Sequence, residues 1–224
     1  MSISAALQIA FGAVLAVLTT ITVERLRKPK LRIEIDDPRD RTYPPGKPAQ
    51  EMRYLTLKVT NVGLPWGRRW MLRAPATQCH GDISFHHLDG QSIFSRPMPA
   101  RWAGSVQPIP LGIQLDNGVT GQIIDEDRFI TVSTTDVAPG QTALLDLAAR
   151  MDDEPQCYGW SNESYLTETP WRNPAWQLPQ GRYLVQVRLF SAGETFTGLF
   201  RLCNEGTVEH FRVEPRMPSD TVRG

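Results

Sequence analysis

Five side chains of the types that bind metals lie within eleven positions of one another. They are Cys79, His80, His86, His87 and Asp89. A thiolate, three imidazoles and a carboxylate could together bind zinc or iron. In an extended strand, however, successive side chains point to opposite faces, so the two adjacent histidines would not easily reach one ion. We expect no metal site and no cofactor, and keep a metal-binding protein or enzyme built on these residues as an alternative.

Nucleophilic catalysis has less support from the same region. Cys79 and His80 are adjacent, so in a strand their side chains would point apart. Ser84 and His86 would share a face, but no serine of the sequence stands in the G-x-S-x-G pattern of a nucleophile elbow. Because no nucleophile, base and orienting group can be named together, we predict no catalytic residue and a non-enzymatic protein.

Tryptophan and arginine alternate in a short stretch that predicts a contact surface. The predicted contact residues are Trp66, Arg68, Arg69, Trp70, Arg73 and Trp102. This mixture is typical of a lipid interface, where indoles find both apolar contact and water, and of protein hot spots. Stacking on single-stranded nucleic acid is a third use of the same residues, and we expect no nucleic-acid partner. In the simplest alternative the tryptophans cover the end of a domain while the arginines face water.

A second aromatic stretch, from Tyr158 to Trp176, mixes tryptophan and tyrosine with asparagine and serine. Stacking and hydrogen bonding from such side chains suit a sugar or peptide, and Asn162 begins a glycosylation sequon. These features support another alternative, an exported glycan- or peptide-binding domain. We expect instead an ordered loop that its own aromatic side chains hold in place.

The first 23 residues predict a transmembrane anchor. From Ile3 to Val23 no side chain is charged, and about 20 residues at ~1.5 Å each span the hydrocarbon core. A basic juxtamembrane segment, residues 24–32, follows directly. Its bases are Arg25, Arg27, Lys28, Lys30 and Arg32. We expect anionic lipid to gather at these bases.

Charge on only one side of the anchor predicts its orientation. No lysine or arginine precedes the apolar stretch, so a cleaved secretory signal fits poorly. Bases near a span tend to stay in the cytoplasm, so we expect the N-terminus outside and the C-terminal domain in the cytoplasm. An export anchor with the domain outside, or an amphipathic surface helix, are the alternatives.

Composition constrains the remaining chain only loosely. The formal net charge is zero and the pI is about 6.9, so bulk charge favours no partner. Acidic residues crowd residues 116–168 without forming a calcium-binding loop, and we expect them to be solvated. Three widely spaced cysteines do not form a disulfide framework and agree with a reducing compartment.

Period-2 alternation predicts strands along residues 30–215. The expected strands are 31–36, 54–61, 81–86, 128–132, 141–147, 183–189, 195–202 and 208–213. The last three form two successive hairpins, with turns at Ala192-Gly193 and Glu205-Gly206. Residues 37–47 are expected to be a loop, and residues 216–224 a flexible tail.

Short strands, eighteen prolines and no long amphipathic helix in this region predict an all-β antiparallel sandwich. In architecture it resembles immunoglobulin-like and fibronectin-III-like domains, although the Cys…Trp…Cys spacing of true immunoglobulin domains is absent. Residues 64–117 and 151–179 are long for sandwich loops, so we leave open whether they bind a ligand. Overall, the sequence predicts a single-pass, membrane-anchored interaction or adaptor module that docks on the membrane surface or on a protein partner.

Overall fold

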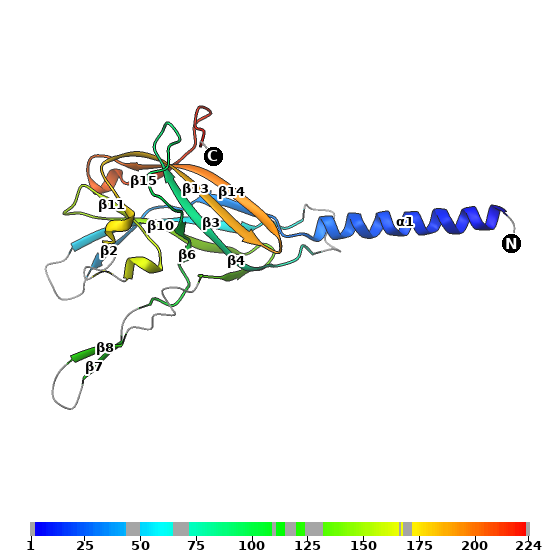
Figure 1. Cartoon of the computed structure of the whole chain (residues 1–224), viewed down its shortest axis with the longest axis horizontal. Helices are drawn as coiled ribbons and strands as arrows, with labels where there is room; N and C mark the ends of the chain where they lie inside the picture. The colour runs from blue at the N-terminus through cyan, green and yellow to red at the C-terminus, as the bar shows by residue number, and fades with distance from the viewer. Residues whose placement is uncertain are drawn as a thin grey trace.

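The computed structural model describes residues 3–43, 50–64, 72–108, 111–114, 120–123, 132–165, 167 and 172–222. One long helix, α1 (Ile3–Arg27), leads into a domain built almost entirely of strands (Figure 1). The side chains of α1 are described from Phe11 onward. Most strands belong to two antiparallel sheets in a sandwich-like arrangement, which confirms the all-β prediction.

The first sheet has the strand order β1-β3-β10-β11-β12, and its strands pair antiparallel. Strand β2 also pairs with β3, and β6 pairs with β10. The bounds are β1 (Leu31–Ile35), β2 (Arg39–Tyr43), β3 (Gln50–Asn61), β6 (Arg101–Trp102), β10 (Thr142–Met151), β11 (Cys157–Gly159) and β12 (Gln177–Leu178). The apolar positions that alternate along β1 and β3 are those that the sequence predicts.

The second sheet has the order β15-β14-β13-β4-β5, with β9 paired to β4. Its strands are β4 (Ala76–His86), β5 (Met98–Pro99), β9 (Thr135–Val137), β13 (Gly181–Ser191), β14 (Glu194–Asn204) and β15 (Arg212–Pro215). A separate hairpin joins β7 (Leu111–Gln114) to β8 (Thr120–Ile123). Three short 3-10 helices complete the described elements: η1 (Asn162–Tyr165), η2 (Pro174–Trp176) and η3 (Val208–His210).

The main core lies between the two sheets. Leu57 and Leu145 face it from the first sheet, and Phe85, Val185 and Leu202 face it from the second. Every one of these five side chains is buried, and a fully buried side chain of this size contributes about 1.5–3 kcal/mol. The alternation that puts them inward leaves their chain neighbours for the outer faces.

The hairpin between β13 and β14 confirms one predicted turn in detail. Ser191 pairs with Glu194, so the loop holds only two residues. Ala192 and Gly193 both have positive φ, at 50° and 75°. This is the backbone conformation of a type I′ turn, whose twist matches that of the flanking strands.

A β-bulge in β10 explains why this strand is buried on both faces. The pairing with β3 shifts between Asp146 and Ala148, so the inward positions before and after the bulge are three residues apart. Beyond the bulge, Ala149 and Met151 turn to the outer face. There they join a second, smaller apolar cluster that also contains Trp160 and Tyr165.

Residues 216–222, which the sequence predicts as part of a flexible tail, are bonded to β14 through Asp220. Asp220 is buried, and its carboxylate accepts two hydrogen bonds from the Arg201 guanidinium, at 2.7 and 2.5 Å. The backbone N–H of Met217 donates to the same carboxylate at 2.7 Å. We call residues 216–222 the C-terminal strap, because this ion pair fastens them against β14.

Three other predictions need comment. Strand β2 lies within residues 37–47, which the sequence predicts as a loop, and its pairing with β3 forms it. Residues 208–213 are a 3-10 turn followed by β15 rather than one strand. The strand predicted at 128–132 lies almost wholly outside the described residues. Among the residues whose side chains the structure describes, which in α1 begin at Phe11, no helix is both long enough and apolar enough to cross a membrane.

Candidate functional site

Helix α1 extends away from the domain (Figure 1), and most of its described apolar side chains are exposed. The side chains that are about half exposed or more are Phe11, Val14, Leu15, Val17, Leu18 and Ile21. A contiguous exposed apolar surface is uncommon on soluble monomers.

Three threonine hydroxyls of α1 form hydrogen bonds within the helix. The hydroxyls of Thr19, Thr20 and Thr22 donate to the backbone carbonyls of Leu15, Ala16 and Leu18, at 2.8–2.9 Å. Such bonds to the residue four positions earlier hide a hydroxyl from its surroundings. The helix from Phe11 to Val23 therefore presents little unsatisfied polarity besides its ends.

The C-terminal end of α1 is capped by a segment far along the sequence. The backbone N–H of Ala74 donates to the carbonyl of Arg27 at 2.5 Å, and the Arg73 guanidinium donates to the carbonyl of Lys28 at 2.7 Å. The last carbonyls of a helix have no partner within the helix, so these two donors satisfy groups that would otherwise need water. They also tie the helix to the domain.

Asn61, which is fully buried at the end of β3, completes this junction. Its side-chain oxygen accepts from the backbone N–H of Lys30 at 3.2 Å. Its amide nitrogen donates to the carbonyls of Ala74 and Val137, at 3.0 Å each. Three separate stretches of chain therefore meet at one side chain directly below the helix.

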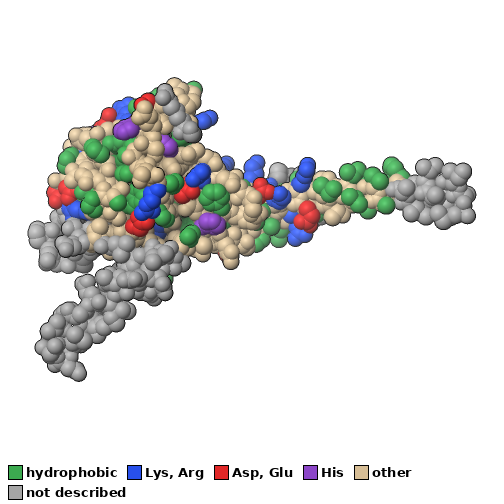
Figure 2. Space-filling model, viewed as in Figure 1, with side chains coloured by type: hydrophobic (Ala, Val, Ile, Leu, Met, Phe, Trp, Pro, Cys, Tyr) green, Lys and Arg blue, Asp and Glu red, His purple; other side chains and the backbone are tan. Residues whose placement is uncertain are grey.

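The bases of residues 24–32 differ in whether they form ion pairs. Lys28 forms an ion pair with Glu194 at the start of β14, and Arg32 pairs with Glu34 at 2.6 Å. The side chains of Arg25, Arg27 and Lys30 are exposed and form no ion pair with any described residue. Figure 2 shows lysine and arginine side chains where the helix meets the domain, and hydrophobic side chains along the helix beyond them.

The predicted tryptophan–arginine contact surface is only partly described. Trp66, Arg68, Arg69 and Trp70 lie outside the described residues. Arg73 caps the helix and is half-buried, so it is a junction residue rather than a free contact.

Trp102 does not belong to a contact surface, and that prediction is wrong. It is 2% exposed, and its indole N–H donates to the Cys79 carbonyl at 2.9 Å. A buried indole is stable there because its single donor has a partner.

The five candidate metal ligands are not brought together. Cys79 is buried in the core, where its thiol lies 3.3 Å from the Ala76 carbonyl and desolvation raises its pKa. His80 stacks near Phe190, with ring centroids 5.6 Å apart, while His87 lies near Tyr183 at the other end of β4. Among the described residues, no group of three histidine, cysteine, aspartate or glutamate side chains could hold a metal ion.

Two members of that set have local structural roles. His86 is buried, and desolvation lowers its pKa. The Asp89 carboxylate accepts from the backbone N–H of Gln91 at 2.9 Å, which is a turn contact.

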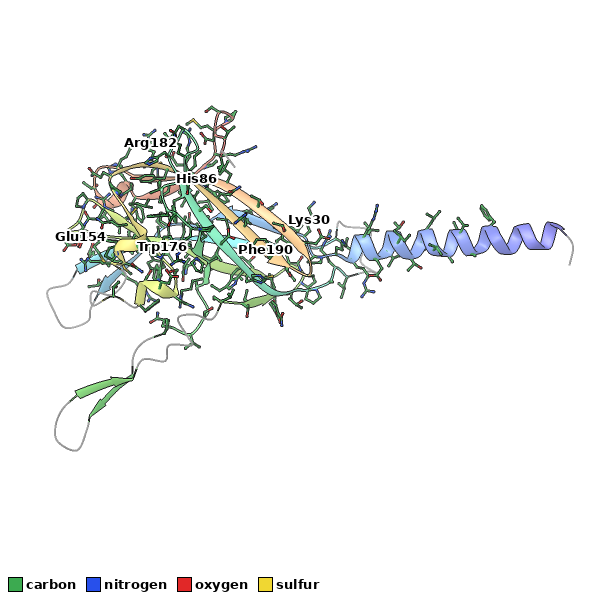
Figure 3. The ribbon with its side chains drawn as sticks, viewed as in Figure 1. Lys30, His86, Glu154, Trp176, Arg182 and Phe190 are labelled. Carbon is green, nitrogen blue, oxygen red and sulfur yellow. The ribbon has the colours of Figure 1, made fainter. Side chains whose placement is uncertain are left out.

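Four aromatic side chains of the 158–176 stretch that the structure describes are buried. Tyr158, Trp160, Tyr165 and Trp176 are each no more than 9% exposed, so they offer no stacking platform to a sugar. Figure 3 labels Trp176, which lies within the domain.

Trp176 contacts two other described side chains, Glu163 and Arg96. Its indole N–H donates to the Glu163 carboxylate at 2.9 Å, and Arg96 donates two hydrogen bonds to the same carboxylate. The Arg96 guanidinium also lies 4.8 Å from the ring centroid of Trp176. Glu163 and Trp176 are therefore joined both directly and through Arg96.

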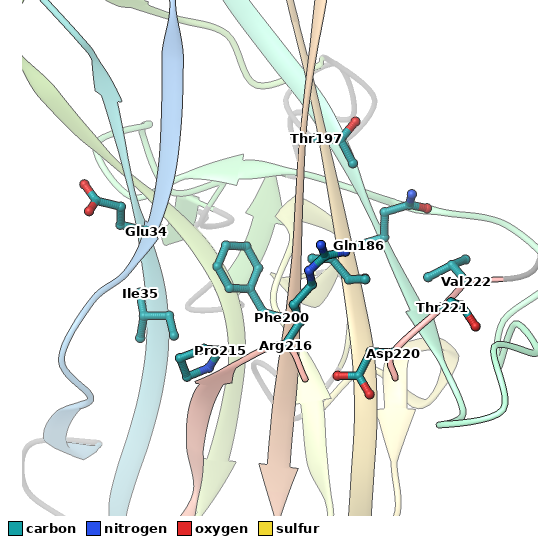
Figure 4. Close-up of a pocket in the computed structure, with 11 residues that line it drawn as sticks. Glu34, Ile35, Gln186, Thr197, Phe200, Pro215, Arg216, Asp220, Thr221 and Val222 are labelled. Atoms are coloured by element: carbon teal, nitrogen blue, oxygen red, sulfur yellow. The ribbon is translucent and has the colours of Figure 1, made fainter. Parts of the chain in front are cut away.

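A groove of about 890 Å³ lies between β1, β13, β14 and the C-terminal strap (Figure 4). Ile35, Phe200 and Val222 contribute apolar surface to it, and Glu34 and Asp220 contribute carboxylates. Asp220 is already paired with Arg201, and Glu34 with Arg32. The groove thus has no unpaired carboxylate for acid–base chemistry.

Comparisons with known proteins add little to this geometry. No family model matches the chain, and no curated protein matches it. One solved structure, titled "X-ray structure of Northeast Structural Genomics Consortium target SoR45", aligns over 79% of this chain and 88% of its own. Its sequence identity is 12% and its TM-score is 0.27, which is too low to support an argument about fold or function.

Sequence reasoning missed a buried charge network on the outer face of the first sheet. Arg101 and Asp146 form an ion pair with both side chains 3% exposed, and the Arg101 guanidinium lies 5.5 Å from the Tyr165 ring centroid. Burial raises the pKa of Asp146 to about 6, although Arg101 opposes that rise.

Nearby, Asp36 accepts from Thr56, Arg39 and Lys58. Every acid in these two groups has a cationic partner, so we assign them to holding β1, β3, β6 and β10 in register. No local sequence pattern marks them, because the partners of Asp146 and Asp36 lie up to 45 residues away.

Proposed function

We propose that this chain is a membrane-anchored, non-enzymatic interaction module. Helix α1 would be its single transmembrane anchor, and the sandwich, an immunoglobulin-like or fibronectin-III-like scaffold, would present its surface to a protein partner at the membrane. The observation that carries the proposal is the exposed apolar surface of α1, from Phe11 to Ile21, which the domain leaves uncovered. Side chains of this kind are stable in hydrocarbon and costly in water.

Two further observations support the anchor. The threonine hydroxyls of α1 are satisfied within the helix, as a lipid environment requires of polar groups. The bases Arg25 and Arg27 occupy the last turn, where a membrane surface would place them in the headgroup layer. The same charge asymmetry favours an outer N-terminus and a cytoplasmic domain.

The short junction supports the role of interaction module. A domain fixed a few residues from a bilayer meets membrane partners at a high effective concentration, so even weak contacts would suffice. The described residues on either side of residues 65–71 are bonded to the chain at the end of α1. Val62 donates to the Lys30 carbonyl at 2.9 Å, and Ala74 donates to Arg27. Trp66, Arg68, Arg69 and Trp70 lie outside the described residues, and their role in contact with a membrane or a partner rests on their sequence alone.

Extraction of membranes with alkaline carbonate tests the anchor in the full-length chain. We expect the wild type to stay in the membrane pellet and the double variant Val14→Arg/Leu18→Arg to be released, since two charges in a span are costly. Val106→Arg is the matched control, because Val106 is 75% exposed on the domain. A wild type that is extracted as readily as the double variant contradicts the anchor.

Protease protection of a C-terminal tag tests the orientation. A tag that is protected in intact cells and cleaved in inverted vesicles agrees with a cytoplasmic domain. Cleavage from outside contradicts the cytoplasmic placement and favours an exported domain.

A further inference from the structure

The five bases that follow the apolar stretch are alike in sequence, but the structure divides them by their partners. The positive charges of Lys28 and Arg32 are locally neutralised, by Glu194 and by Glu34. Arg25, Arg27 and Lys30 are exposed and have no ion pair among the described residues. Three cations without an ion-pair partner among the described residues thus lie within six positions at the end of α1.

The backbone that carries these three side chains is fixed. Lys30 receives a hydrogen bond at its carbonyl from Val62 and donates its own N–H to Asn61. Pro29 and Leu31 on either side are buried, which leaves the Lys30 side chain directed outward at the junction (Figure 3). The carbonyl of Arg27 is bonded to Ala74, so the last helical turn is held as well.

We propose that Arg25, Arg27 and Lys30 bind the phosphate groups of anionic phospholipids around the end of α1. The inference rests on the proposed membrane anchor and names the lipid class that the junction would select. Guanidinium groups pair with phosphate oxygens through two parallel hydrogen bonds, and long basic side chains reach the headgroup layer from a helix end. Each base near an anionic surface contributes about 1 kcal/mol, a factor of about five in affinity.

Lipid selectivity can be measured with the full-length protein in nanodiscs that contain spin-labelled lipids. The measured quantity is the association of spin-labelled phosphatidylglycerol with the protein, relative to that of spin-labelled phosphatidylcholine. We expect a ratio of roughly three to ten for the wild type at low salt, and a fall toward one at 1 M salt. Nanodiscs have no inside or outside, so a change of membrane orientation does not affect the ratio.

Two variants separate the three free bases from general charge effects. Arg25→Gln/Arg27→Gln/Lys30→Gln should bring the ratio close to one. The control removes three exposed charges from the domain, at Arg41, Arg182 and Arg216, and should keep the wild-type ratio. Equal ratios for the wild type and the triple variant of the junction would overturn the inference.

Two other outcomes also contradict it, and they differ from each other. A protein that incorporates into discs but shows a ratio of one, and whose three bases bind polyglutamate instead, would assign them to an acidic protein partner. A protein that does not incorporate into discs of phosphatidylcholine alone would contradict the anchor itself.

Discussion

The Arg73 guanidinium donates to the carbonyl of Lys28 at 2.7 Å, across 45 residues of sequence. This bond and the bond from Ala74 to Arg27 close the end of α1 against the domain. The direction in which the helix leaves the domain is therefore set by hydrogen bonds rather than by a loose linker.

Arg73→Met should loosen this junction without unfolding the domain. Loss of one charged donor to a carbonyl typically costs about 1–2 kcal/mol, and we expect the effect to be local. Hydrogen exchange of the full-length protein should show faster exchange in residues 24–31 and unchanged exchange in β13. Arg216→Met, at an exposed arginine, is the control. Unchanged exchange near the helix end would show that Arg73 does not hold the junction.

Asp220→Asn should release the C-terminal strap. The variant keeps the shape of the side chain but loses the charged pair with Arg201, at a cost of about 1–3 kcal/mol. Exchange should accelerate in residues 216–222. The Arg201 guanidinium keeps the pKa of Asp220 below its usual 3.8. The strap contribution is therefore present above pH 4 and is lost only as the pH falls further. Release of the wild-type strap already at pH 6 would contradict this account.

Arg101→Met should be among the most destabilising single changes, because it leaves a buried carboxylate without its partner. Breaking a buried pair in this way costs about 3–5 kcal/mol. The pKa of Asp146 is already raised to about 6, and it should rise further without the arginine. Since the folded state then favours the protonated acid, the loss of stability should grow as the pH increases from 5 to 8. The double variant Arg101→Met/Asp146→Leu should recover most of it, as measured by urea unfolding.

His86 should make the domain less stable in mild acid. Desolvation lowers the pKa of this buried histidine below its usual 6.5, so the folded state favours the neutral ring. Its contribution is complete above pH 6.5 and decreases as the pH falls below that value, by at most about 1.4 kcal/mol per pH unit. His86→Leu should flatten the curve of unfolding free energy between pH 7.5 and 5.5. If His86→Leu keeps the wild-type slope, another group is responsible.

Local pattern was enough to find the strands whose side chains alternate between core and solvent. β1, β3, β13 and β14 carry this alternation themselves, and the Ala192-Gly193 turn favours their hairpin. β2 has no such pattern, because its side chains from Arg39 to Thr42 are exposed and only the pairing with β3 makes it a strand. The sequence does not predict the C-terminal strap for a similar reason. The role of Asp220 depends on its ion pair with Arg201, which no local pattern indicates.

The candidate site shows the same limit. The five bases after the apolar stretch can be read from the sequence. Which of them form ion pairs cannot, because the partner of Lys28 is Glu194, 166 residues away. Trp102 was assigned to a surface on its composition, and the structure buries it because a backbone carbonyl is available to its indole N–H. Sequence alone does not give the distance between such partners.

The three cysteines allow this domain to fold in either a reducing or an oxidising compartment. Cys79, Cys157 and Cys203 are all free and buried, and desolvation raises the pKa of each thiol, that of Cys203 to about 11. Thiols of this kind react slowly with oxidants and with other thiols. The fold therefore needs neither a reducing nor an oxidising compartment. The buried thiols are compatible with either side of a membrane, so the proposed orientation rests on the charges beside α1.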